Sequence, residues 1–182
     1  MVTEPIGFIS PKIDGVETKY FECLGSGVYD TKNQGDSIHQ MAQYVESIEF
    51  GFDLNHLYVK VVTEPINLEK INEYDTEFCI FKPNPLNVII NLGSLVNNRI
   101  NSSLSIRRNG EAINHRGGIE AAFKTFLELK IPLNCFGGTV AEKVHFQVKV
   151  YRHQKLIEKW PKEDLIVCEI PGPEFEKIEW KV

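Results

Sequence analysis

A glycine-containing loop, Gly25 to His39, holds the side chains best suited to binding chemistry. Tyr29 offers a flat ring, and a pyranose stacks its C–H face on such a ring while polar neighbours hold its hydroxyls. The polar neighbours in this loop are Asp30, Asn33, Asp36 and His39. This combination predicts a carbohydrate-binding site, although loops of this composition are also typical of solvated turns. Trp160, which precedes a proline, fits either a further stacking ring or a lock on the terminal strands.

The same loop suits one metal ion. Asp30, Asn33 and Asp36 supply oxygen atoms, which are the ligands that calcium prefers. Their spacing differs from that of an EF-hand loop, and a plain polar turn explains them as well. Calcium is therefore the one cofactor that the sequence suggests.

Catalytic motifs are missing from the sequence. The five histidines stand apart without an HxxxH or HExxH spacing, and there is no GxSxG elbow and no GxxxxGK[ST] phosphate loop. The four cysteines form no CxxC pair, which argues against zinc and favours reduced, buried thiols. We therefore expect a protein that is not an enzyme.

Composition limits the partners. A chain of 182 residues with 42% apolar residues can form one well-buried core. Acids and bases are mixed along the chain with a net charge of -5, so we expect no nucleic-acid partner. No apolar run reaches the roughly 20 residues of a membrane span, and no signal peptide is visible, so we expect no membrane partner and a cytoplasmic location.

Period-two alternation of apolar and polar residues dominates the chain. The ranges 43–63, 104–115 and 144–160 each predict a β-hairpin, and Asn109-Gly110 is a strong turn signal in the second. Helical periodicity is weak, and Gly118 to Thr125 fits either a short helix or a bent edge strand. We predict one domain over residues 1–182, an all-β, antiparallel two-sheet sandwich of jelly-roll or DOMON-like type with at most two short helices. Its predicted core contains Phe50, Phe52, Leu57, Val59, Leu129, Ile131, Phe146 and Val148.

Several segments carry a family resemblance. The start PKIDGVE, the hairpin GFDLNHLYVKV, and the segments FLELKIPLNCFGG and VHFQVKVYRHQKLIEKWP resemble family 9 carbohydrate-binding modules and their DOMON-like relatives. Two further segments, KYFECLGSGVYD and QGDSIH, resemble a more specific group. They are similar to the "YFEWLGAG-x-Y … GGAMH" stretch in the C-terminal region of bacterial and archaeal family 57 glycoside hydrolases. Cys23 stands where that group often has Trp, and Ser26 where it often has Ala.

The resemblance implies a non-catalytic accessory domain of an α-glucan-processing hydrolase. It implies two kinds of partner, an α-glucan polysaccharide or oligosaccharide and a separate catalytic domain or subunit. Two alternatives stay open: a structural docking domain that binds no sugar, and a DOMON-like haem or electron-transfer module, for which Met41 is the only internal methionine.

Overall fold

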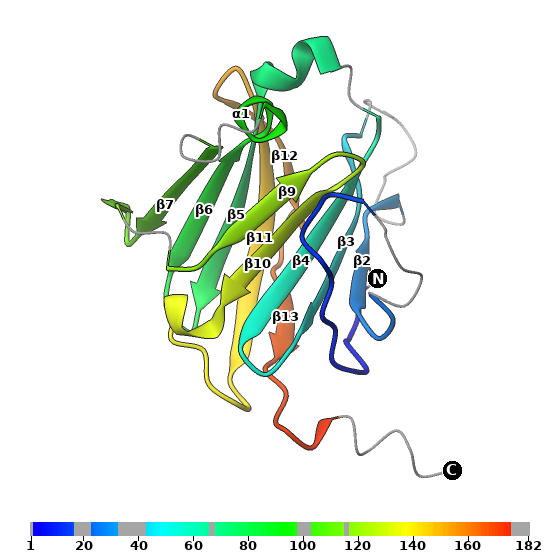
Figure 1. The fold of residues 1–182 in the computed structure, drawn as a ribbon, viewed down its shortest axis with the longest axis vertical. Coiled ribbons are helices and arrows are strands. Elements are labelled where there is room, and N and C mark those ends of the chain that lie inside the picture. The colour runs from blue at the N-terminus through cyan, green and yellow to red at the C-terminus, as the bar shows by residue number, and fades with distance from the viewer. Residues whose placement is uncertain are drawn as a thin grey trace.

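The computed structural model describes residues 2–16, 23–32, 43–65, 68–97, 103–114 and 117–175. Within them, thirteen strands form two antiparallel sheets that face each other (Figure 1). The six-stranded sheet, sheet A, has the order β1-β2-β3-β4-β10-β9. The seven-stranded sheet, sheet B, has the order β12-β11-β5-β6-β7-β8, with β13 also paired to β11. The predicted all-β, two-sheet sandwich is therefore confirmed.

The strand bounds follow the alternating segments closely. Sheet A contains β1 (Val2–Thr3), β2 (Gly27–Asp30), β3 (Val45–Phe52), β4 (His56–Thr63), β9 (Glu120–Phe123) and β10 (Leu127–Pro132). Sheet B contains β5 (Tyr74–Lys82), β6 (Leu86–Asn91), β7 (Leu104–Arg108), β8 (Glu111–Ile113), β11 (Lys143–Arg152), β12 (Lys155–Trp160) and β13 (Ile166–Glu169). The helices are short: η2 (Leu68–Glu73), α1 (Leu92–Val96) and η3 (Leu133–Cys135).

The hairpin of β3 and β4 turns on one aspartate. Oδ1 of Asp53 accepts the backbone N–H groups of Asn55 and His56, each at 2.7 Å. Its carboxylate also lies 3.0 Å from Nδ1 of His56, and its Oδ2 accepts the hydroxyl of Tyr58 at 2.7 Å. A short polar side chain that bonds to the backbone two residues ahead is a common way to close a turn. This turn sets the register that pairs Phe50 with Val59.

The two sheets share one core. Phe146 of β11 packs its ring 5.4 Å from that of Phe50 in sheet A and 5.1 Å from that of Phe78 in sheet B, measured between centroids. All eight predicted core residues are buried in this cluster, as their alternation along the strands requires. Gly118 to Thr125 contains the edge strand β9 rather than a helix.

Candidate functional site

The two aromatic rings of the expected sugar site lie in the core. Tyr29 is 1% exposed and Trp160 is 4% exposed, and both belong to the cluster between the sheets. Tyr29 is buried because β2 joins sheet A beside β3 and turns this side chain inward. The expectation that these rings are exposed for stacking is therefore wrong.

Of the other residues expected at the sugar site, the structure describes only Asp30. Asn33, Asp36 and His39 lie outside the described residues, and so does Met41 of the haem hypothesis. Oδ1 of Asp30 accepts the backbone N–H of Lys32 at 2.8 Å, as in a simple polar turn. Among the described residues, no group of three or more histidines, cysteines, aspartates and glutamates is placed to hold a metal ion.

A cluster of polar side chains covers the outer face of sheet B. Strand alternation places Phe78 and Ile80 inward, so the residues between them point away from the core. We call this set the polar face: Asp75, Glu77, Asn87, Asn91, Lys149 and Tyr151. These residues come from the three neighbouring strands β5, β6 and β11.

Glu77 lies at the centre of the polar face. Its Oε1 accepts the side-chain amide of Asn87 at 2.7 Å, and its Oε2 accepts the hydroxyl of Tyr151 at 2.9 Å. The ammonium of Lys149 lies 3.9 Å from the same Oε2. Donors from both neighbouring strands therefore hold one carboxylate, which fixes the positions of all four side chains.

A second hydrogen bond extends the polar face toward one end. The side-chain amide of Asn91 donates to Oδ1 of Asp75 at 2.8 Å. Burial and the hydrogen bond to Glu77 raise the pKa of the Tyr151 phenol, so this hydroxyl is a donor at neutral pH. The amide oxygens of the two asparagines leave further acceptors on the same surface.

An exposed ring marks the other end of β5. Phe81 is 43% exposed and lies opposite a register shift between His145 and Phe146. Burial lowers the pKa of His145, and Lys82 and Lys143 lower it further, so its imidazole is neutral at pH 7. The exposed Val167 of β13 pairs with His145. A partly apolar end and a hydrogen-bonding middle thus lie along one sheet face, an arrangement suited to a ligand with apolar faces and hydroxyl edges.

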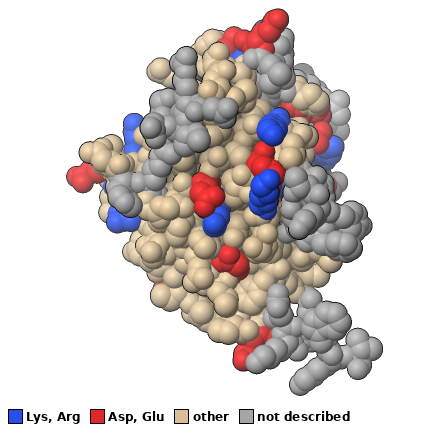
Figure 2. Space-filling model, viewed as in Figure 1, with Lys and Arg blue, Asp and Glu red and all other residues tan. Residues whose placement is uncertain are grey.

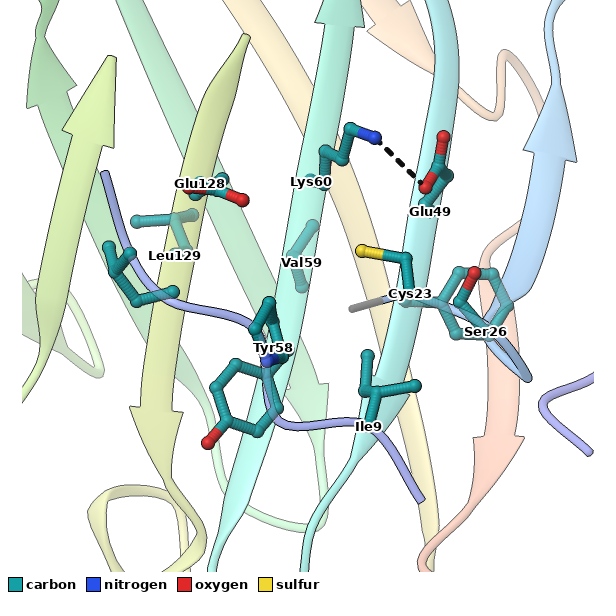
Figure 3. Close-up of a pocket in the computed structure, with 12 residues that line it drawn as sticks. Ile9, Cys23, Ser26, Glu49, Tyr58, Val59, Lys60, Glu128 and Leu129 are labelled. Atoms are coloured by element: carbon teal, nitrogen blue, oxygen red, sulfur yellow. Dashed lines mark hydrogen bonds and ion pairs between the residues drawn. The ribbon is translucent and has the colours of Figure 1, made fainter. Parts of the chain in front are cut away.

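A small hollow lies on the opposite side of the molecule, over sheet A (Figure 3). The N-terminal segment, residues 6–16, crosses the outer face of this sheet above it (Figure 1). The floor carries a row of charged residues across three strands. In the strand register, Glu49 of β3 lies opposite Lys60 of β4, and Lys60 lies opposite Glu128 of β10. The enclosed space is only about 10 Å³, room for about one water molecule. A sugar ring therefore does not fit while the segment lies in place.

Of the charges of the hollow, Glu128 is buried, whereas Lys60 and Glu49 are partly exposed. Lys60 Nζ lies 3.3 Å from Oε2 of Glu49 and 4.3 Å from the centre of the Phe126 ring. Glu128 is 3% exposed, and its Oε2 accepts the backbone N–H groups of Asp14 and Gly15 at 3.0 and 2.8 Å. Burial raises the pKa of this carboxyl, against the opposing effect of these two hydrogen bonds. On the face of the molecule seen in Figure 1, the visible charges of both signs lie close together on a mostly uncharged surface (Figure 2).

Sequence reasoning missed both surfaces because each depends on pairing between distant strands. Alternation correctly places Glu128 on the outer face of β10, but nothing in that pattern shows that the N-terminal segment covers it. The partners of Glu77 on β6 and β11 become neighbours only through the strand order.

Neither a family model nor a curated protein matches this sequence. In the part of the chain that the structure describes, no helix has the length and apolar character needed to cross a membrane.

Proposed function

We propose that this chain is a non-catalytic, carbohydrate-binding accessory domain and that the polar face of sheet B, together with Phe81, is its ligand surface. The observation that carries the proposal is the hydrogen-bonded cluster around the largely buried Glu77, with the exposed Phe81 further along the same strand. Sugars need a flat apolar contact and fixed hydrogen-bonding groups, and this surface offers both.

The ligand class follows from the chemistry of the surface and from the resemblance. Asn87, Asn91, Lys149 and Tyr151 offer neutral or cationic donors and amide acceptors, which suit hydroxyl groups. The likeness to the accessory region of family 57 glycoside hydrolases favours an α-glucan and a catalytic domain or subunit as the second partner. One stacked ring and a few solvated hydrogen bonds give about 4–5 kcal/mol, so we expect a Kd on the order of 0.1–1 mM.

The test is a titration of the protein with maltooligosaccharides, followed by amide NMR shifts. We expect shifts at β5, β6 and β11, with affinity lowered about tenfold or more in Phe81→Ala and Asn87→Ala. The matched control is Leu54→Ala, which removes an exposed apolar side chain (56% exposed, against 43% for Phe81) from the β3–β4 turn of the other sheet. Shifts confined to the 25–39 loop would overturn the placement of the site.

Silence at millimolar sugar would overturn sugar binding itself and favour the structural docking domain. Catalysis needs a separate assay, because binding and hydrolysis are independent. We expect the pure chain to release no reducing sugar from starch, and release that survives purification to homogeneity would contradict the non-catalytic assignment.

A further inference from the structure

We infer that the N-terminal segment, residues 6–16, is a releasable cover over the outer face of sheet A and that Glu128 is its latch. This inference does not depend on the sugar-binding proposal, which concerns the opposite sheet. It rests on how the segment is attached, on what lies beneath it and on how the sheet makes room for it.

The attachment is local at both ends. At one end, the N–H of Ile6 donates to the carbonyl of Gly25 and the N–H of Ile9 donates to that of Phe52, each at 2.8 Å. At the other end, the N–H groups of Asp14 and Gly15 converge on one oxygen of Glu128. The carbonyl of Gly15 accepts the N–H of Thr125 at 2.9 Å. The segment forms no β-strand in the described residues, so it adds no ladder of hydrogen bonds to the sheet.

Between its two ends the segment makes few polar contacts with the sheet, one of them the hydrogen bond between the side chains of Ser10 and Tyr58. Pro11 has no backbone N–H to donate, and Lys12 has a side chain that is 72% exposed and pairs with Asp14 of the same segment at 3.1 Å. An exposed ion pair of this kind contributes little to stability. Release therefore costs the hydrogen bonds at the two ends and the burial of Ile9, which is 5% exposed.

Beside the segment, the outer face of sheet A carries charged side chains, which are uncommon in a permanent interior. Glu49, Lys60 and Glu128 form a charged row there, and the Lys60 side chain is only 12% exposed. A buried ion pair is generally no more stabilising than well-packed apolar residues, because both charges lose their hydration. Release of the segment accounts for the charged row, because the sheet face then meets water or a polar ligand. The row then presents two carboxylates, one ammonium and the Tyr58 ring to that ligand.

The sheet and the segment fit closely at two glycines. A Cβ added at Gly51 would lie 2.8 Å from Cδ1 of Ile9, so the missing side chain of Gly51 leaves the space that Ile9 fills. Gly15 has φ +76°, and a Cβ there would lie 2.5 Å from the backbone nitrogen of Lys124. Both contacts seat the segment without linking it covalently to the sheet.

Hydrogen exchange of the intact chain tests the latch. In Glu128→Ala we expect the amide protons of Asp14 and Gly15 to exchange about 10–100-fold faster, while those of Val59 and Leu129 in the central strands keep their protection. Glu128→Gln retains an oxygen acceptor, so its effect should be smaller. Equal loss of protection in the segment and the central strands, or no change at Asp14 and Gly15, would overturn the inference.

Chemical labelling tests what the release exposes. Reductive methylation of Lys60 should be about tenfold faster in Glu128→Ala than in the parent chain, whereas that of the exposed Lys32 should not change. If Glu128→Ala does not fold, Ile9→Ala loosens the other end of the segment and should accelerate Lys60 labelling by itself. An unchanged Lys60 rate in a folded variant would contradict a releasable cover.

Discussion

The indole N–H of Trp160 donates to Oε2 of Glu158 at 2.9 Å, and the same oxygen accepts the backbone N–H of Val45 at 3.0 Å. The other oxygen of Glu158 accepts the backbone N–H of Tyr44. One carboxylate of β12 thus binds the start of β3 in the opposite sheet. Trp160 is buried in the core and its indole helps to hold this carboxylate in place.

Replacing Glu158 should destabilise the domain at this joint. Glu158→Ala leaves two backbone N–H groups and one indole N–H without their acceptor, which we expect to cost about 2–4 kcal/mol. Glu158→Gln keeps one accepting oxygen and should cost less. Urea unfolding followed by tryptophan fluorescence measures both, and a cost below about 0.5 kcal/mol for the alanine variant would show that water replaces the carboxylate.

The turn at Asp53 should make stability depend on pH. Burial raises the pKa of this carboxyl, but hydrogen bonds from Tyr58, Asn55 and His56 outweigh that effect and hold the pKa below its ordinary value of 3.8. A carboxyl with a lowered folded-state pKa stabilises the fold above the unfolded value, and this contribution is lost as the pH falls through the folded value. Asp53→Asn should therefore cost about 1–2 kcal/mol at pH 7, and progressively less below pH 3.8.

The measurement for Asp53 is a pair of urea unfolding curves at each pH, one for the parent chain and one for the variant. The stability gap should narrow as the pH is lowered. A gap that stays constant from pH 7 to pH 2 would mean that the turn does not need the charge.

Substitution of two glycines with positive φ distinguishes the cost of backbone strain from the cost of a steric clash. Gly110 has φ +83° with no atom within 4 Å of an added Cβ, so Gly110→Ala should cost only the strain of about 1 kcal/mol. Gly15 has a similar φ, but an added Cβ would meet the backbone of Phe123 and Lys124. We expect Gly15→Ala to cost about 1–3 kcal/mol more than Gly110→Ala in thermal or urea unfolding, and equal costs would show that the segment shifts to make room.

The thiols should divide into two classes. All four cysteines lie in the described part of the chain and form no disulfide, and Cys79 and Cys168 are buried. Burial raises the pKa of both to about 12, with Glu77 adding to the effect at Cys79 and Glu4 at Cys168. Iodoacetamide at pH 8 should therefore alkylate these two far more slowly than Cys135, and denaturation should abolish the difference, because the thiolate is the reactive form.

Local pattern was sufficient for most of the strands but not for β2. The alternation around Asp53 predicts both β3 and β4, and Asn109-Gly110 predicts the turn between β7 and β8. These signals lie within a few residues of the structure they specify. The position of Tyr29 could not be predicted in this way, because a glycine-rich segment with an aspartate looks like a loop until β3 pairs with it.

The two candidate surfaces depend on contacts between residues that are distant in the sequence, which the local pattern of residues does not show. The alternation of β10 places Glu128 outward, yet its burial comes from Gly15, which is 113 positions away. Tyr151 and Glu77 meet across 74 positions. Each candidate surface therefore required the strand order as well as the strands.

These separations also bear on how the chain reaches its native state. The hairpins need only short loops, but the pairs β4–β10 and β5–β11 at the centre of each sheet join segments that are far apart in the chain. Closing long loops costs entropy before any pairing compensates for it, and all-β sandwiches of this kind typically fold in milliseconds to seconds. We expect the hairpins to form early and both sheet centres late. Until β10 and β11 arrive, one edge of β4 and one edge of β5 stay unpaired and open to other chains, so refolding yield should fall as protein concentration rises.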